Sequence, residues 1–140
     1  MGDIYDGELM AHVKAPHNWG RLADPEATGT AANPLCGDEV NIYLKLGGQK
    51  IADARFDGEL CAVGKASASL MTDAIRGHTK EEIAELRTRV ASMLEDGEDP
   101  PLGSLEALRA VRQYRVRIRC ALLPWDALGR ACSGSTADPL

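Results

Sequence analysis

The 140-residue sequence lacks any apolar run that approaches the ~20 residues needed to span a membrane as a helix. Its start, MGDIYDGELM, also lacks the basic and apolar regions of a signal peptide. Basic residues are fewer than acidic residues, so the formal net charge is -5 at pH 7. This balance argues against nucleic acid as a partner, since phosphate-backbone binding requires a concentrated basic face. We therefore expect a cytoplasmic protein that has neither a membrane nor a nucleic acid as its partner.

The cysteines include no CxxC pair, although the chain has four of them: Cys36, Cys61, Cys120 and Cys132. The gaps 61 − 36 = 25 and 120 − 61 = 59 are not those of a zinc finger. In a reducing cytoplasm, thiols serve more often as metal ligands or nucleophiles than as disulfides. Composition alone leaves two interpretations open, a site assembled by the fold or buried cysteines that act as small apolar residues. Cys132 lies next to a polar tail, and we treat it as incidental.

The chain fits a single domain, 1–140, because a chain of this length can bury about two thirds of the surface that its unfolded form exposes. Periodicity and breakers then predict its elements. In order, these are a helix over 3–13, an edge strand over 28–32, a hairpin with strands at 40–46 and 51–56, a helix from Cys61 to Gly77, a helix from a capping box at 79–82 to Glu95, a short helix capped by Ser104, an extended segment over 114–119, and a helix with Pro124 in its first turn. His17 and Trp19 fall in a turn-rich segment, where we expect a packed indole and a solvated imidazole.

The predicted hairpin brings two distant cysteines together. Its first strand leaves the Cys36 region and its second strand ends shortly before Cys61. Because paired strands lie about 4.8 Å apart, the base of the hairpin makes these two regions neighbours. Cys61 is also predicted at a helix N-terminus, where the partial positive charge stabilises a thiolate. Cys120 is predicted at or just before the N-terminus of the last helix, which is the same electrostatic setting.

One turn supplies two donor side chains. In the stretch NPLCGDEV, Cys36 and Asp38 flank Gly37, so a bent backbone can direct both toward one point. Together with Cys61 and Cys120, they form a set of three sulfur atoms and one oxygen. Such a set suits zinc in tetrahedral coordination. Iron in an iron–sulfur cluster is the other candidate.

Three motifs now resemble a known family. NPLCGDEV, DARFDGELCAVGKASASLMTDAI and VRIRCALLPWDAL are similar, in order and spacing, to the cysteine motifs of the IscU/NifU N-terminal superfamily of iron–sulfur cluster assembly proteins. The chain most resembles the SufU-type branch, because Arg119 stands where IscU-type scaffolds have a histidine and residues 98–114 resemble an extra SufU segment. The resemblance implies an α+β fold of the SufE/NifU-like kind, with a small antiparallel three-stranded sheet packed against several helices.

The resemblance also implies a function. The positions that bind zinc in SufU-like proteins correspond to Cys36, Asp38, Cys61 and Cys120. The implied activity is that of a zinc-dependent sulfurtransferase, which accepts persulfide sulfur from a SufS-type cysteine desulfurase and passes it to the downstream iron–sulfur assembly machinery. Cys36 is the implied persulfide acceptor because it lies on a flexible turn, and Cys120 is the alternative acceptor.

The chain departs from the family pattern at Leu60, Lys65, Arg115 and Pro124. None of these departures removes a ligand, so they bear on partner docking more than on the metal site. Lys65 lies one helical turn after Cys61, where its positive charge is expected to favour a thiolate.

Two other functions remain open. The first is an IscU-like scaffold on which a transient 2Fe–2S cluster is assembled. Arg119 counts against it, since arginine stays protonated and cannot be a ligand. The second is a non-catalytic, zinc-stabilised interaction domain, which would not accelerate a cysteine desulfurase.

Overall fold

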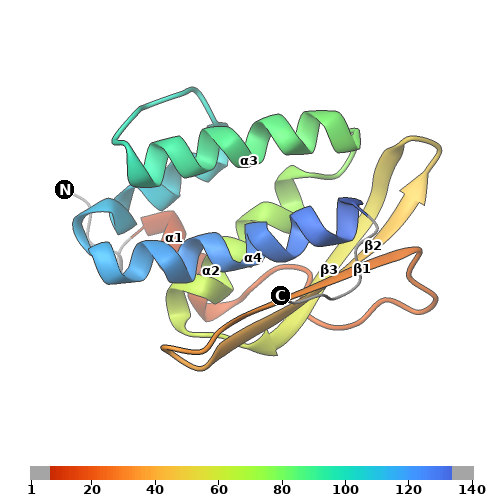
Figure 1. Ribbon diagram of the computed structural model, residues 1–140, viewed down its shortest axis with the longest axis horizontal. Coiled ribbons are helices and arrows are strands. Elements are labelled where there is room, and N and C mark those ends of the chain that lie inside the picture. The colour runs from red at the N-terminus through yellow and green to blue at the C-terminus, as the bar shows by residue number, and fades with distance from the viewer. Residues whose placement is uncertain (1–6, 134–140) are drawn as a thin grey trace.

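The structure is a computed structural model, and it describes residues 7–133 (Figure 1). Its elements are α1 (Gly7–Lys14), β1 (Ala27–Asn33), β2 (Asp38–Gly47), β3 (Lys50–Glu59), α2 (Ala62–Ala74), α3 (Lys80–Glu95), the 3-10 helix η1 (Gly103–Gln113) and α4 (Arg115–Ser133). Residues 3–6 of the predicted first helix lie outside the described range. Within residues 7–133, none of the helices is long and apolar enough to cross a membrane.

The three strands form one antiparallel sheet in the order β1-β2-β3, which confirms the predicted fold class and hairpin. Alternate side chains of β2 are completely buried, because the period of two directs Val40, Ile42 and Leu44 to one face. Their register partners continue this face onto the neighbouring strands: Ala27, Gly29 and Ala31 on β1, and Ala54, Phe56 and Gly58 on β3. The predicted edge strand over 28–32 is therefore confirmed as β1.

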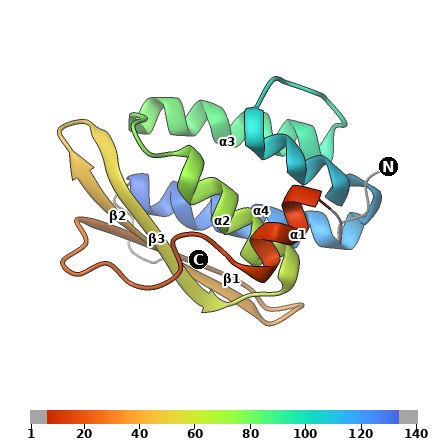
Figure 2. The ribbon, with the colours of Figure 1, turned by 180° about the vertical axis from the view of Figure 1, so that it is seen from behind.

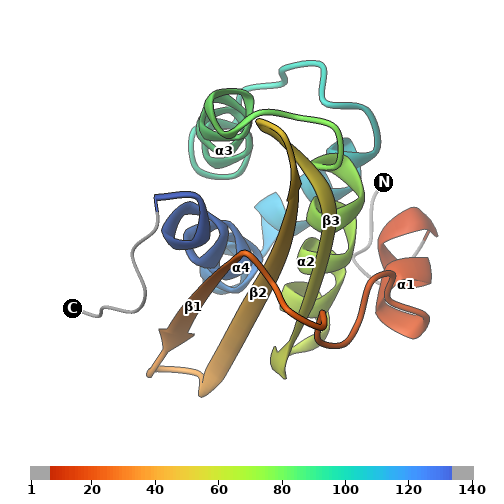
Figure 3. The same ribbon diagram turned by 90° about the vertical axis from the view of Figure 1, so that its right-hand side faces the viewer.

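The helices pack on this apolar face of the sheet. Figure 3 shows α4 beside β1 and β2, while α2 lies beside β3 and α1 packs on the side of α2 that is away from α4. The view from behind in Figure 2 agrees on the position of α1. The approach of β1 to α4 requires a residue without a side chain, since a Cβ built at Gly29 would lie 2.1 Å from the Ala127 carbonyl oxygen. The small residues of β1 thus position α4.

Two helix starts follow their sequence signals. Cys61 caps α2, and Thr79 caps α3 with the reciprocal hydrogen bonds of a capping box to Glu82. These two predictions are confirmed, as is the end of α3 at Glu95.

Four predictions for the C-terminal part are wrong. The segment before Cys120 is helical rather than extended, because α4 begins at Arg115. Cys120 consequently lies in the second turn of α4, not at its N-terminus, and Pro124 lies inside the helix rather than in its first turn. Ser104 does not cap the short helix, since η1 is preceded by Leu102, which makes no side-chain capping bond.

Polar contacts with α2 lie next to the interior proline of α4. Pro124 has no N–H to donate to the Cys120 carbonyl, and its ring disturbs the adjoining turn. The Ser67 hydroxyl donates to the Ala121 carbonyl at 2.6 Å, and the Trp125 indole N–H donates to Ser67 Oγ at 3.2 Å. These bonds join α2 to α4 next to Cys120. Trp125 is buried and belongs to the core.

Candidate metal centre

Segments far apart in the sequence bring the predicted donors together. Cys36 lies in the β1–β2 turn, β2 begins at Asp38, Cys61 immediately precedes α2, and α4 carries Cys120. In Figure 1 this turn, the end of β3 and the start of α2 lie near one another at the lower left. One donor atom from each of Cys36, Asp38 and Cys120 lies within 4.8 Å of the other two. Cys61 is not a member of this group of three, but its side chain is near enough to Cys120 to raise the pKa of that thiol.

Cys36 is the exposed member of the group. Its turn closes through the Gly37 N–H, which donates to the Asn33 carbonyl at 2.9 Å. Gly37 has φ 78, a left-handed conformation that side chains rarely adopt, so glycine is required between the two donors. The Cys36 thiol lies 3.8 Å from the same carbonyl and faces solvent. A partner molecule can therefore reach this sulfur atom directly.

Asp38 is buried beneath the turn, and its carboxylate is held in place. Its Oδ2 accepts the backbone N–H of Cys61 at 3.1 Å, which links the start of β2 to the cap of α2. Gly64 of α2 packs next to this carboxylate, since a Cβ built there would lie 3.5 Å from Asp38 Oδ2 and, more tightly, 3.1 Å from Leu60 Cδ2. The second oxygen of the carboxylate can bind a cation while this bond is kept.

Cys61 occupies the helix N-terminus that the sequence predicts. Its Sγ accepts the backbone N–H of Gly64 at 3.4 Å, in the manner of an N-cap. Unpaired N–H groups of the first turn give this end of α2 a partial positive charge, which suits a site that gathers negatively charged donors.

Cys120 is the buried member, with 4% of its surface exposed. Burial, and after it the neighbouring Cys61 side chain, raises the pKa of Cys120 from 9.0 to about 12. Without a cation this thiol is neutral at pH 7. A bound divalent ion reverses that balance, because a thiol that coordinates a metal is deprotonated.

Arg117 is a member of the site that sequence reasoning missed. The charge of Cys61, and after it that of Cys120, raises the pKa of Arg117, so its guanidinium lies close to both sulfur atoms. Arg117 and Cys120 share a helix face because they are three residues apart. The strand predicted over this segment concealed that relation. The Lys65 ammonium, to which the sequence assigned a similar role, lies over the Trp19 ring at 5.4 Å.

The donor chemistry fits a zinc ion. Three thiols and a carboxylate would carry four negative charges, which a low-dielectric pocket cannot hold without a cation. A divalent ion neutralises two of these charges, and the Arg117 guanidinium neutralises a third. Cys36, Asp38, Cys61 and Cys120 could thus hold a zinc ion, with one exposed thiolate and the remaining donors at least partly buried.

Comparison with known sequences connects this arrangement to a family. The model of the NifU-like N terminal domain matches residues 4–121. The chain belongs to this family. It is 38% identical over 128 residues to the "Zinc-dependent sulfurtransferase SufU" of Bacillus subtilis, covering 89% of this chain and 86% of the relative. It is 36% identical over 138 residues to the "Iron-sulfur cluster assembly scaffold protein IscU" of Streptococcus pyogenes, covering 96% and 86% of the two chains.

Solved structures of relatives have the same fold. A putative iron–sulfur cluster assembly scaffold protein for the SUF system from Fervidobacterium islandicum superposes with a TM-score of 0.86 at 33% identity, covering 92% of this chain and 96% of that one. A NifU-like N-terminal protein from Brucella abortus gives a TM-score of 0.84 at 29% identity, covering 94% of each chain. These relatives confirm the family resemblance that the three cysteine motifs predict.

Proposed function

We propose that this NifU-like domain is a zinc-dependent sulfur-transfer protein of iron–sulfur cluster assembly, and that it acts in the cytoplasm with a SufS-type cysteine desulfurase. The observation that carries the proposal is the graded exposure of the donor set. Cys36 is exposed on a turn, whereas Asp38 and Cys120 are buried behind it. One sulfur atom is therefore available for reaction, while the other donors can keep the ion.

The proposed reaction is a thiol exchange at Cys36. Bound zinc would keep the cysteines as thiolates at neutral pH, which is the chemistry that it supplies. The Cys36 thiolate attacks the terminal sulfur atom of a persulfide on the desulfurase cysteine. The S–S bond of that persulfide breaks, its electron pair leaves with the desulfurase cysteine as a thiolate, and a new S–S bond forms on Cys36. The transferred sulfur then passes to an acceptor of the downstream assembly machinery.

Cys120 is less suited to accept sulfur. It lies inside a helix and is almost completely buried, so a partner's persulfide could reach it only after α4 moved. The positive charge of Arg117 lies near Cys61 and Cys120. We assign Arg117 the role of offsetting part of the negative charge of the zinc-bound thiolates.

Two apolar side chains near the site suit a partner protein. Leu35 is 96% exposed beside Cys36, and Val116 is 80% exposed beside Arg117. Large apolar side chains this exposed at the rim of a polar site are typical of protein interfaces. The desulfurase is thus proposed to dock over the β1–β2 turn and the first turn of α4.

Turnover of a SufS-type desulfurase, measured with and without the zinc-loaded protein, tests this function. We expect the protein to accelerate turnover and Cys36→Ala to abolish the acceleration. Cys132→Ala is the matched control, because this fourth cysteine lies at the far end of α4 and should be dispensable. Acceleration that survives Cys36→Ala, or none from the wild-type protein, would refute the proposal and favour a zinc-stabilised interaction domain.

The scaffold function is the second candidate, since relatives of similar identity are named IscU scaffolds. Arg119 occupies the position where the resemblance to the family implies a histidine in scaffolds, and its side chain lines a cavity with Asn33 and Asp126. An arginine there cannot complete the iron coordination. Metal analysis separates the two functions, because near-stoichiometric zinc in a colourless protein supports transfer, whereas bound iron and sulfide with visible absorption support a scaffold.

A further inference from the structure

A second cluster of metal-ligating side chains lies at the other end of α2. His12 of α1, His17 of the following segment and Asp73 near the end of α2 each offer a donor atom within 4.8 Å of the other two. Asp73 follows Cys61 by 73 − 61 = 12 residues. At 1.5 Å per residue, the helix separates this cluster from the cysteines by about 18 Å. It is therefore distinct from the candidate metal centre.

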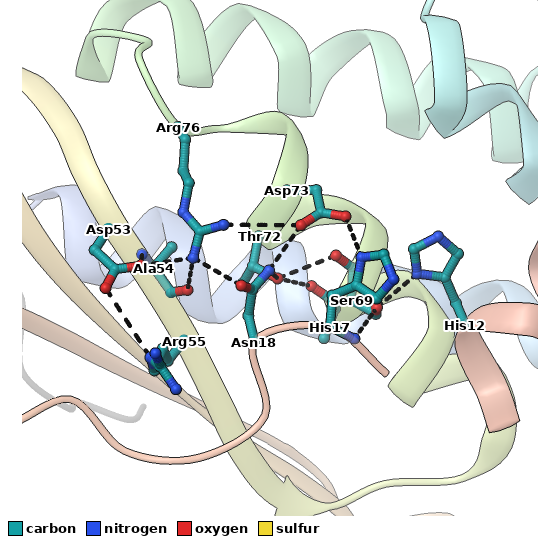
Figure 4. Close-up of polar contacts among 11 residues, drawn as sticks. His12, His17, Asn18, Asp53, Ala54, Arg55, Ser69, Thr72, Asp73 and Arg76 are labelled. Atoms are coloured by element: carbon teal, nitrogen blue, oxygen red, sulfur yellow. Dashed lines mark hydrogen bonds and ion pairs between the residues drawn. The ribbon is translucent and has the colours of Figure 1, made fainter. Parts of the chain in front are cut away.

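Hydrogen bonds hold the two histidines next to each other (Figure 4). His12 Nδ1 lies 2.6 Å from Ser69 Oγ, and the backbone N–H of His17 donates to the same oxygen at 2.7 Å. The two rings are 4.5 Å apart between centroids. Ser69 is fully buried in α2, so it fixes the two residues against a rigid element. His17 is exposed, as the sequence predicts, but it is also held in place by hydrogen bonds.

Asp73 is oriented toward the histidines by its own contacts. Its Oδ2 lies 2.6 Å from His17 Nδ1, while its Oδ1 accepts the Asn18 amide at 2.9 Å. The Arg76 guanidinium binds Asp53 at 2.6 Å and forms a longer ion pair with Asp73 Oδ1 at 3.8 Å, so the carboxylate oxygen that faces His17 is Oδ2. Partners that orient a ligand in this way are typical of metal sites.

The cluster opens into a cavity of about 400 Å³, whose walls include His12, His17, Asp73 and Glu8. Burial, and after it the neighbouring His17, lowers the pKa of His12. The neutral imidazole is the form that binds metals. Glu8 lies one helical turn before His12 and adds negative charge to the same cavity. Access, charge and protonation state are therefore all compatible with a bound cation.

We propose that His12, His17 and Asp73 bind a divalent transition-metal ion such as Zn²⁺, with water or Glu8 in the remaining coordination position. Two imidazoles and one carboxylate suit zinc, and small side-chain rotations would bring all three donors to about 2.0–2.2 Å from a common ion. Because the donors come from α1, the segment after it and α2, the ion would fasten the N-terminal region to the helix that begins at Cys61.

Zinc chloride titration into the full-length, metal-free protein tests this site. We expect a second equivalent to bind in addition to the one at the cysteines, and His17→Ala to abolish it. His78→Ala is the matched control, since His78 is the third histidine of the chain and pairs with Glu82 outside the cluster. Asp73→Asn removes the charged donor with little change in volume. If the cysteines bind no zinc, every variant binds one equivalent of zinc less. The His17→Ala protein should then still bind less zinc than the His78→Ala protein.

NMR spectra of the histidine ring nitrogens distinguish metal binding from a purely structural role of the cluster. On addition of the second equivalent, one ring nitrogen each of His12 and His17 should shift as coordination begins, while the His78 resonances stay in place. The His17→Ala and His78→Ala variants keep the buried His12, and circular dichroism checks that both proteins fold. Equal zinc binding by His17→Ala and His78→Ala, or unmoved His12 and His17 resonances, would show that the cluster is only a hydrogen-bonded network.

Discussion

At the scale of single residues, Asp38 connects the candidate metal centre to the backbone. Its carboxylate is buried and accepts the Cys61 N–H. It also belongs to the donor group that contains Cys36 and Cys120. A carboxylate is a harder ligand than a thiolate and binds zinc less strongly. Asp38 can therefore complete the coordination while it leaves the exposed thiolate exchangeable.

Asp38→Ala should consequently lower the affinity for zinc. Loss of a residue that only supports a metal ligand typically costs ~10–100-fold, and loss of the ligand itself should cost at least as much. The buried Cys61 N–H would also lose its acceptor. Competition with a zinc chelator gives the affinity, and the desulfurase assay gives sulfur acceptance. Glu39→Ala is the control, because Glu39 is the exposed neighbour on the same strand. Unchanged zinc content and sulfur acceptance in Asp38→Ala would exclude this role.

At the scale of elements, the sequence predicted what local signals encode. The first strand of the β2–β3 hairpin alternates apolar and polar residues over most of its length, and the starts of α2 and α3 carry capping residues, so all three were predictable. The start of α4 was not, because Val116 and Ile118 alternate with arginines as in a strand, and Pro124 is more typical of a first helical turn. Contacts across the fold, including the Ser67 bonds to α4, override both signals. The same error concealed Arg117.

The contact between β1 and α4 gives a prediction at this scale. Gly29→Ala places a Cβ against the Ala127 carbonyl and the Ala131 N–H, both backbone groups that cannot rotate away. Since overpacking of this kind typically costs about 1–3 kcal/mol, we expect a lower free energy of unfolding in urea. Gly47→Ala is the matched control, because its Cβ would meet only the Ala52 side chain at 3.3 Å. Equal stability of the two variants would contradict the tight packing of α4 on β1.

At the scale of the whole molecule, the candidate metal centre would cross-link parts of the chain that are distant in sequence. Its ligands come from the β1–β2 turn, the cap of α2 and the second turn of α4. In the unfolded chain these ligands are far apart, so zinc binds the folded state in preference. The ion therefore stabilises the fold by linkage, by about 4 kcal/mol when free zinc is 1,000 times its dissociation constant.

Removal of zinc with a chelator should accordingly lower the midpoint of thermal unfolding. The His17→Ala background isolates the contribution of the cysteines, because the second proposed ion is then absent. In this background, Cys120→Ser should abolish the zinc-dependent shift, whereas Cys132→Ser should retain it. Calorimetry of each protein with zinc and with chelator measures the shift. A midpoint that does not respond to zinc in the His17→Ala protein would mean that the four donors do not hold an ion in the folded state, and the sulfur-transfer proposal would then lose its physical basis.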